Sequence, residues 1–370
     1  MLKIGRYRIA DPDEIATPAL VLFEDRVDHN IRTVCELAGG AENLFTHAKT
    51  HKSDAVTRKQ IAQGIENFKL ATLSELQMVL RAGARRAILA NPQTQPGKIE
   101  MLIDLAMEFP RAWIATIASS PAHVGMLGDA AARREQPLRL MLDLDSGMHR
   151  TGIAMNDDAV GLYRQVDEHS FLETAGLHWY DGHDTFVDPV QRAAVASGHI
   201  EALQAFRERL EAAGLTVPVI VAGGAYSFSY YANTDGMYGS PGSFIYWDGL
   251  CMTDLADLPF QNAAVILVQV VDRHPDLGTI TTDLGNKYVC THQELGKRAH
   301  LVDHDDAELV LHNEEYGVFR MAGELPEIGA YLLAIPGYIG PTVTRYPGSH
   351  VIDPAGNVVD YYEHTARDRA

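Results

Sequence analysis

The sequence has little cysteine. Only Cys35, Cys251 and Cys290 occur among 370 residues, and no two of them form a CxxC pair. This odd and widely spaced set argues against a disulfide framework and against a structural zinc site. No run of about 18 apolar residues occurs, and the opening MLKIGRYRIADPDEI lacks an apolar core of signal-peptide length. We therefore expect a protein of a reducing, cytoplasmic compartment with no membrane partner.

Basic residues are also few. The 31 Lys and Arg residues face 49 Asp and Glu residues, which gives a formal net charge of −18. Such a charge repels a phosphate backbone and argues against a nucleic-acid partner. At roughly 150 residues per domain, the length predicts about two domains.

Short apolar runs alternate with amphipathic helical patterns over the first two thirds of the chain. Helix start signals stand at Asp25, Ser53, Ser74 and Pro189. This alternation predicts parallel βα units, which close into a (β/α)₈ barrel or form an open doubly wound sheet. The predicted strands are Leu44–Ala48, Lys69–Thr72, Arg86–Ala90, Trp113–Ile117, Leu138–Leu144, Thr174–Trp179, Val217–Val221 and Ser243–Trp247.

From about residue 255 the pattern changes to short strands and turns without a long helix. We predict an all-β C-terminal domain there, joined by strand-like residues near the N-terminus. The predicted strand segments are AAVILVQVVDRH (263–274), GTITTDLG (278–285), KYVCTH (287–292), AELVLHN (307–313), YLLAIPGY (331–338) and NVVDYYEH (357–364).

The first candidate for chemistry is Lys49 in THAKTHKS (46–53), directly after the first predicted barrel strand. The loops that follow barrel strands build active sites. A desolvated lysine near His47, His51 and Lys52 has a lowered pKa and is a candidate Schiff-base amine. The alternative is a solvated basic turn.

Two further predicted strands end in polar motifs. DLDSGMHRTG (143–152) places Arg150 after a strand, where its rigid donor fork suits a phenolate or a carboxylate; the alternative is a capped turn with a surface arginine. HWYDGHD (178–184) offers His178, Tyr180 and His183 as an acid, a base or a partner of a ring nitrogen. We expect one of these three to be only a packed core residue.

Glycine-rich turns follow the last two predicted strands. AGGAYS (222–227) and SPGSF (240–244) allow backbone N–H groups to converge on a phosphate, and Ser243 adds a hydroxyl. Neither turn is a GxGxxG or a Walker loop, and each alone is an ordinary turn. A lysine, an arginine, a phenol and a glycine cradle at the ends of different strands are together the set that pyridoxal 5′-phosphate requires.

With these motifs in this order, the chain resembles the fold-type III pyridoxal-phosphate enzymes, the alanine-racemase-like barrels. It is most similar to their D-threonine aldolase and D-serine dehydratase branch, from TPALVLFEDRVDHNI (17–31) to the end of the chain, with KLATLSE (69–75) and GLHWYDGH (176–183) also in family order. The resemblance implies a (β/α)₈ barrel over 17–254, a C-terminal β domain over 255–370 to which residues 1–16 add a strand, and a homodimer. It places the Schiff base on Lys49, the phenolic oxygen beside Arg150 and the ring nitrogen near Tyr180. The implied cofactor-binding residues are Lys49, His47, Arg150, Tyr180, Gly223, Gly224, Ala225, Gly242 and Ser243.

The chain departs from the resemblance at the family's metal site. The stretch that carries a His and, two residues on, a Cys or Asp reads PGYIGPTV (336–343), with Tyr338 and Gly340 at the ligand positions. Neither is a plausible ligand of a divalent ion. Tyr316 replaces the histidine of an EEHG motif, and Phe186 stands where D-threonine aldolases carry a catalytic histidine. We expect no metal, and we predict that Tyr316 and Tyr338 fill the vacated pocket with a phenol hydrogen-bond network.

The resemblance favours a lyase that cleaves the Cα–Cβ bond of a D- or β-hydroxy amino acid without metal. Lys49 and Tyr180 are catalytic candidates, and His183, Tyr316 or Tyr338 takes the hydroxyl proton. Three alternatives stay open. The chain is a metal-independent racemase or epimerase, a D-serine or D-threonine dehydratase, or a non-catalytic carrier of pyridoxal phosphate.

Overall fold

The computed structural model describes residues 1–368. These residues form two compact units. We call them the barrel unit (Val34–Lys49 and Thr57–Gly242) and the β unit (Met1–Thr33, Thr50–Val56 and Ser243–Asp368). Residues 369–370, at the end of the predicted range 255–370, lie outside the described residues.

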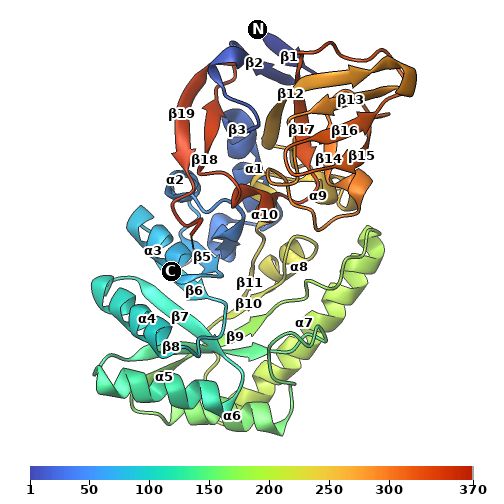
Figure 1. Ribbon diagram of the computed structural model, residues 1–370. Coiled ribbons are helices and arrows are strands. Elements are labelled where there is room, and N and C mark those ends of the chain that lie inside the picture. Colours follow the sequence, from blue (N-terminus) through green and yellow to red (C-terminus); the bar gives the residue numbers. More distant parts are fainter. Residues whose placement is uncertain (369–370) are drawn as a thin grey trace. The chain divides into compact units, whose positions relative to one another are not determined.

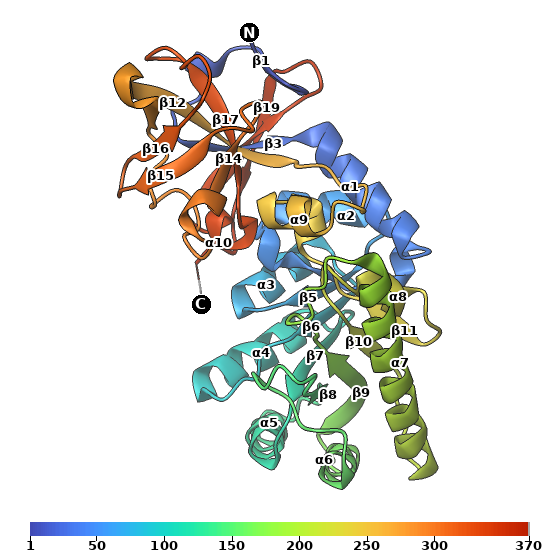
Figure 2. The ribbon, with the colours of Figure 1, turned by 90° about the vertical axis from the view of Figure 1, so that its right-hand side faces the viewer.

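Eight parallel strands form the barrel unit, in the sheet order β11-β10-β9-β8-β7-β6-β5-β4 (Figures 1 and 2). A parallel bridge between Leu44 and Gly239 brings the two edges together, and the Phe45 N–H donates to the Gly239 carbonyl at 2.9 Å. The closed barrel is therefore confirmed, and the alternative of an open doubly wound sheet is not. The strands are β4 Thr46–His47, β5 Asn67–Leu70, β6 Arg86–Leu89, β7 Trp113–Ala118, β8 Leu138–Leu144, β9 Leu172–Trp179, β10 Ile220–Ala222 and β11 Met237–Gly239.

Helices alternate with these strands, and α3, α5, α6 and α7 begin at side-chain caps. At Thr72 the hydroxyl accepts the Glu75 N–H at 3.2 Å while the Glu75 carboxylate accepts the Ala71 N–H at 2.6 Å. This reciprocal cap starts the helix at Leu73, not at Ser74 as the sequence suggested. The helices are α1 Glu24–Leu37, α2 Asp54–Ala62, α3 Leu73–Ala82, α4 Pro96–Glu108, α5 Pro121–Arg133, α6 Asp157–Asp167, α7 Pro189–Ala212 and α8 Phe228–Ala232.

The eighth barrel strand is not where the sequence placed it. Ser243–Trp247 does not form a strand: it begins with a 3₁₀ turn over Ser243–Ile245, and the Trp247 N–H donates to the Ser243 carbonyl at 2.8 Å. The strand is β11, whose three residues stand between Gly236 and Ser240. Three residues with a terminal glycine are too short to show an apolar pattern.

Apolar side chains fill the barrel. They belong to one buried cluster to which strands on opposite sides of the ring contribute, so this cluster is the barrel interior. Its residues are Phe45, Ile88, Ala115, Ile117, Met141, Ala175, Val219 and Val221. Full burial of each large member stabilises the fold by roughly 1.5–3 kcal/mol. Burial of a charged group on this inward face costs free energy, so such a group is a candidate for a functional role.

The β unit contains a nine-stranded, mostly antiparallel sheet with the path β15-β16-β13-β12-β3-β18-β19, and β17 pairs with both β12 and β14 (Figure 2). The predicted β domain is confirmed, but KYVCTH (287–292) forms no strand. Two short helices, α9 Gly249–Asp254 and α10 Ile339–Val343, complete the unit. The strands are β3 Ala19–Phe23, β12 Ala264–His274, β13 Thr279–Thr282, β14 Ala299–Leu301, β15 Glu308–His312, β16 Gly317–Arg320, β17 Tyr331–Pro336, β18 Gly348–Ile352 and β19 Val358–Glu363.

The N-terminal segment belongs to the β unit. β1 Leu2–Ile4 and β2 Tyr7–Ile9 form a hairpin of their own. Strand β3 lies between β12 and β18 with all five residues buried, although it falls within the range 17–254 predicted for the barrel. The continuous apolar run ALVLF is typical of a strand covered on both faces. The domain limits 17–254 and 255–370 stay predictions.

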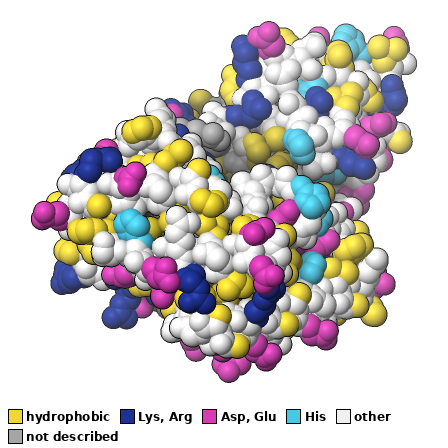
Figure 3. Space-filling view, turned by 90° about the horizontal axis from the view of Figure 1, so that it is seen from below, with side chains coloured by type: hydrophobic (Ala, Val, Ile, Leu, Met, Phe, Trp, Pro, Cys, Tyr) yellow, Lys and Arg dark blue, Asp and Glu magenta, His cyan; other side chains and the backbone are white. Residues whose placement is uncertain are grey.

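Among residues 1–368, no helix combines the length and apolar character needed to cross a bilayer. Cys35, Cys251 and Cys290 are all free thiols, as their spacing predicted. On the face drawn in Figure 3, acidic and basic side chains are interspersed, and no broad area carries charge of one sign.

Candidate active site

Three predicted residues meet at the carboxyl ends of the barrel strands. Lys49 lies in the 3₁₀ turn Ala48–Thr50 directly after β4, Arg150 in the loop after β8, and Tyr180 directly after β9. The Lys49 Nζ is 5.7 Å from the centroid of the Tyr180 ring, and the Arg150 Cζ is 4.9 Å from it. Cations at these distances are attracted to the face of an aromatic ring. The structure thus brings the predicted amine, guanidinium and phenol together.

A fourth residue of this group, Lys69, was missed as a candidate. Its Nζ is 5.3 Å from the centroid of the Tyr180 ring, and the residue is only 2% exposed. Lys69 pairs in register with His47 on β4 and Ile88 on β6, and paired residues of a sheet point to the same side. Lys69 therefore points into the barrel. A lysine inside the apolar strand NFKL was a signal in the sequence.

The cations around Tyr180 lack anionic partners. Among the residues that the structure describes, no carboxylate forms an ion pair with Lys49, Lys69 or Arg150. Buried charges are normally paired. Three basic side chains in this state around one ring suit an anionic group.

The two lysines are both shifted toward the neutral amine. Burial lowers the pKa of Lys49, the Arg150 charge lowers it further, and Glu75 opposes both. Burial, followed by the charge of Lys49, lowers the pKa of Lys69 to about 7. The direction predicted for Lys49 is therefore correct.

Burial, the largest cause of the lowered pKa of Lys49, is as predicted, but the neighbouring cation is not one of those predicted. Burial lowers the pKa of His51 to about 3, so this imidazole is uncharged at neutral pH. Lys52 donates from its Nζ to the Ala366 carbonyl at 3.3 Å. The cation that lowers the pKa of Lys49 is Arg150, from a distant part of the chain. His47 is 9% exposed, and its Nδ1 accepts the Lys49 N–H at 3.3 Å.

Asp143 and His178 form a buried pair on the inward faces of β8 and β9. The imidazole Nδ1 is 2.7 Å from Asp143 Oδ1, and each residue is 3% exposed. Within the described chain, Asp143 Oδ2 and His178 Nε2 have no hydrogen-bond partner. Burial lowers the pKa of His178, which favours its neutral form. Both side chains line a cavity of about 10 Å³ with Arg150 and Tyr180, room for about one water molecule.

The first glycine turn is shaped by close contacts. Gly223 has φ +81°, and a Cβ there would lie 2.7 Å from Tyr231 Cδ2 and 2.9 Å from Ser227 Oγ. A Cβ at Gly224 would lie 3.2 Å from Tyr180 Cε2. Only glycine fits this turn without displacing its neighbours.

The backbone amides of the two glycine turns divide into two groups. The Gly223 N–H donates to the Trp179 carbonyl and the Gly224 N–H to Ser227 Oγ, both at 3.2 Å. The N–H groups of Ala225 and Gly242 donate to no acceptor among the described residues. Gly223 and Gly224 therefore give the cradle its shape, and Ala225 and Gly242 offer free donors. Ser243 follows Gly242 and begins the 3₁₀ turn of the β unit.

Asp181 supports this turn, and it was also missed as a candidate. The residue is 4% exposed and accepts hydrogen bonds from Ser227 Oγ at 2.9 Å and Tyr231 Oη at 2.8 Å. Both donors are the residues that enclose Gly223. Asp181 therefore holds the cradle from behind. An acid directly after Tyr180 was visible in the sequence, but the donors lie 46 and 50 residues away.

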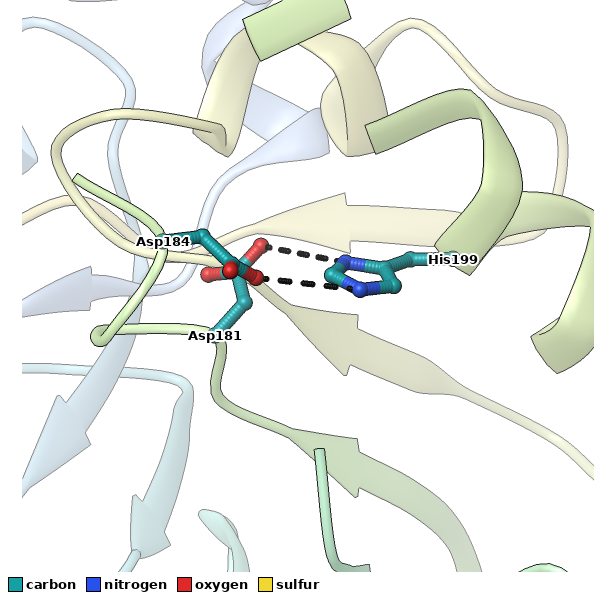
Figure 4. Close-up of side chains that lie close together, drawn as sticks. All are labelled: Asp181, Asp184 and His199. Carbon is teal, nitrogen blue, oxygen red and sulfur yellow. Dashed lines mark ion pairs between the residues drawn. The ribbon is translucent and has the colours of Figure 1, made fainter. Parts of the chain in front are cut away.

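Asp181 also belongs to a group that could hold a metal ion. In the described chain, this group comprises Asp181, Asp184 and His199, with one ligand atom each within 4.8 Å of the others (Figure 4). The His199 Nδ1 is 3.9 Å from Asp181 Oδ2, and its Nε2 is 3.7 Å from Asp184 Oδ2. The two ring nitrogens thus face different carboxylates. An imidazole that lies between two carboxylates in this way fits an ion-pair bridge better than three ligands that converge on one metal ion.

The remaining candidates lie in loops, His183 and Phe186 in the barrel unit and Tyr316 and Tyr338 in the β unit. His183 is exposed in the loop after β9, with its Nε2 3.7 Å from Asp184 Oδ1. Phe186 lines a small cavity beside Asp184. Within the β unit, Tyr316 is 49% exposed and lines an open cavity of about 480 Å³. The Tyr338 ring centroid lies 6.1 Å from that of His292. The phenol network between Tyr316 and Tyr338 stays a prediction.

Comparisons with known proteins find relatives along most of the chain. Over 361 residues the chain is 25% identical to the D-threonine aldolase of an Arthrobacter species, covering 95% of this chain and 93% of that protein. It is 24% identical over 349 residues to the 3-hydroxy-D-aspartate aldolase of Paracoccus denitrificans (strain Pd 1222), covering 90% and 87%.

Solved structures extend the likeness to the whole fold. The D-threonine aldolase of Filomicrobium marinum superposes with a TM-score of 0.86 at 25% identity, covering 99% of both chains. The D-threo-3-hydroxyaspartate dehydratase of Delftia sp. HT23 shares the fold with a TM-score of 0.82 at 20% identity, covering 96% and 98%. Residues 24–248, more than half of the chain, match the family described as alanine racemase, N-terminal domain. The chain therefore belongs to this family of fold-type III pyridoxal-phosphate barrels, as its motifs predicted.

Proposed function

We propose that the chain is a pyridoxal-phosphate-dependent lyase that splits the Cα–Cβ bond of a D-configured β-hydroxy amino acid. The observation that carries this proposal is the group of three basic side chains around the Tyr180 ring, Lys49, Lys69 and Arg150, none of which forms an ion pair with a carboxylate of residues 1–368. Pyridoxal phosphate brings an aldehyde, a phenolic oxygen and a phosphate to such a site. The likeness to a D-threonine aldolase over 95% of the chain supports the reaction class.

The residues of the barrel unit fit the cofactor. Lys49 provides the amine for the aldehyde, Arg150 the cation for the phenolic oxygen, and Tyr180 an aromatic wall at the ring nitrogen. The free N–H groups of Ala225 and Gly242 suit the phosphate, with Ser243 as a further donor. When bound, the cofactor supplies an electron sink that weakens the bonds at the Cα of an attached amino acid.

The chain's own groups then decide which bond breaks. The lowered pKa of Lys49 provides an amine that attacks an aldehyde and moves a proton at Cα. Arg150 keeps a fixed charge for an anionic oxygen. We assign the removal of the β-hydroxyl proton to His183, whose imidazole is exposed in the loop after β9 beside Asp184. Tyr316 and Tyr338 are the alternative bases.

We further propose that this lyase works without a divalent metal. Tyr338 and Gly340 stand at the positions where the resemblance places the metal ligands. A phenol and a hydrogen atom do not replace an imidazole and a thiolate or carboxylate. Loss of a Lewis acid impairs the departure of hydroxide more than the loss of a hydroxyl proton. Cleavage is therefore favoured over dehydration.

The test is proton NMR of the chelator-treated, cofactor-loaded enzyme with D-threonine in heavy water, with L-threonine and the Lys49→Ala variant as controls. Formation of glycine and acetaldehyde supports the proposal. An oxo acid would instead identify a dehydratase, and exchange of the Cα proton without cleavage would identify a racemase. No change with a panel of D-β-hydroxy amino acids would point to a carrier. Activity that appears only after zinc or manganese is added would overturn metal independence alone.

The resemblance also supports a homodimer as the working form. Light scattering during size-exclusion chromatography gives the molar mass directly. Twice the chain mass supports the dimer, and the mass of a single chain in an active sample contradicts it.

A further inference from the structure

His199 has no role in the reaction proposed above, although it faces two aspartates of the loop after β9 (Figure 4). It lies partly buried on α7, and its Nδ1 is 3.3 Å from the Tyr231 Oη on α8. Its Nε2 is 3.7 Å from Asp184 Oδ2. The imidazole also makes a T-shaped contact with Trp179 at the end of β9, with ring centroids 5.3 Å apart. One side chain thus joins α7 to α8 and to the end of β9.

The hydrogen bond between His199 and Tyr231 has one direction. The Tyr231 hydroxyl donates its hydrogen to Asp181 Oδ2 at 2.8 Å. Burial, followed by the charge of Asp181, raises the pKa of Tyr231, so the phenol keeps this hydrogen. A hydroxyl has one hydrogen and two lone pairs. The Tyr231 oxygen therefore accepts the second bond, and the His199 Nδ1 donates it.

Tyr231 in turn shapes the first glycine turn. Its ring lies against Gly223, where an added Cβ would be 2.7 Å from Tyr231 Cδ2. The hydroxyl groups of Tyr231 and Ser227 occupy the two oxygens of the buried Asp181 carboxylate. Ser227 Oγ also accepts the Gly224 N–H at 3.2 Å. The position of Tyr231 therefore helps to set the backbone of this turn.

We propose that His199 is a positioning residue for the phosphate cradle: its Nδ1–H fixes the Tyr231 hydroxyl, and Tyr231 holds the first glycine turn in the conformation that receives the phosphate. Asp184 and Trp179 hold the imidazole in the orientation that directs Nδ1 to Tyr231. The inference rests on the proposed function only in assigning the phosphate to this turn.

The test compares pyridoxal 5′-phosphate with pyridoxal, which lacks the phosphate. Fluorescence titration of the cofactor-free, full-length chain gives the dissociation constant of each ligand. The dissociation constant of pyridoxal divided by that of pyridoxal 5′-phosphate is the phosphate preference. A change in this preference between variant and wild type isolates the cradle from effects on the rest of the site.

Two substitutions of His199 separate its two nitrogens. Asparagine places an amide nitrogen near the position of Nδ1, and glutamine places one near that of Nε2. We expect His199→Gln, which loses the donor to Tyr231, to lower the phosphate preference by roughly three- to tenfold. His199→Asn keeps this donor and should stay within about twofold of the wild type.

Tyr230 provides the matched control, because its hydroxyl also joins α8 to α7. It donates to the Pro189 carbonyl at 3.4 Å in an exposed position. Tyr230→Phe removes this bond between the same two helices and leaves the Tyr231 hydroxyl in place. The phosphate preference of this variant should equal that of the wild type.

Two results would overturn the proposal: an unchanged preference in His199→Gln, or an equal loss in His199→Asn and His199→Gln. Circular dichroism checks the fold of each variant. If His199→Gln does not fold, His199→Leu, which has no donor, decides in its place and must lower the preference. A His199 effect in a chain without lyase turnover supports the inference and refutes the proposed function. A wild type with no phosphate preference refutes the cradle and the role of His199 together.

Discussion

A methyl group at Gly223 should damage both the fold and the phosphate cradle. The residue has φ +81°, and an added Cβ would meet Tyr231 Cδ2 at 2.7 Å and Ser227 Oγ at 2.9 Å. Neither neighbour can move freely, because both donate to the buried Asp181 carboxylate. Displacement of Ser227 also loosens the Gly224 N–H, which donates to its hydroxyl. The substitution Gly223→Ala therefore strains the turn that carries Ala225.

Gly214 provides a matched control. It has φ +82°, close to that of Gly223, but a Cβ there would meet nothing within 4 Å. Gly214→Ala should lower the free energy of unfolding by roughly 1–2 kcal/mol, because alanine is strained in the left-handed conformation. Gly223→Ala adds overpacking of roughly 1–3 kcal/mol. At about 2–4 °C per kcal/mol, Gly223→Ala should melt roughly 2–12 °C below Gly214→Ala.

The assay combines thermal melting of the cofactor-free chains with fluorescence titration by pyridoxal phosphate. Gly214→Ala should bind the cofactor like the wild type. Gly223→Ala should bind at least about tenfold more weakly, equivalent to about 1.4 kcal/mol. Equal melting temperatures and equal affinities in the two variants would refute the steric argument. Equal affinities with unequal melting would restrict Gly223 to a structural role.

Three further predictions concern neighbouring groups. Asp181→Asn keeps the size of the side chain but weakens the bonds from Ser227 and Tyr231, at roughly 1.5–3 kcal/mol for each bond to a charged acceptor, and differential scanning calorimetry should show the lower melting temperature. Arg150→Ala should raise the pKa of Lys49, because Arg150 lowers it, whereas Arg150→Lys should leave it near the wild-type value; trace labelling of the cofactor-free chain with acetic anhydride across pH, read by peptide mass spectrometry, measures it. The pKa of His51 is lowered by burial to about 3, so only the unfolded chain gains a proton there between about pH 6.5 and 3. Below pH 6.5 the free energy of unfolding should therefore fall by up to about 1.4 kcal/mol per pH unit from this group, and urea titrations of His51→Gln should show a shallower decline.

Much of the barrel could be predicted from the sequence, because each buried strand has its own apolar run. Leu138–Leu144 was predicted to the residue, and Arg86–Leu89 to within one. The misplaced eighth strand shows the limit. Ser243–Trp247 is apolar because it is buried, and burial does not separate a strand from a tight turn. The bridge between Leu44 and Gly239, the last residue of β11, closes the ring. This pairing, and not the apolar pattern, identifies β11 as the eighth strand.

The candidate site could be predicted only where a motif follows a strand. Lys49, Arg150 and Tyr180 were found in this way, and they meet around one ring. Lys69 and Asp181 were missed because their roles depend on contacts between strands. One faces the Tyr180 ring from β5, and the other bonds to Ser227 and Tyr231. The spacing of residues along the sequence does not reveal such contacts between strands.

The distribution of charge in the barrel explains why these missed residues matter. The interior is apolar through Ile88, Ile117 and Val221, and polar side chains appear where the strands end. At that level His47 and Lys69 are paired on neighbouring strands. Asp143 and His178 are paired on another two. Charges at this depth interact strongly, since little water separates them. Arg150 and Glu75 act on the Lys49 amine, and Lys49, Arg150, Asp143 and Asp181 act on Lys69. The protonation of the two amines therefore depends on residues that follow or belong to several different strands.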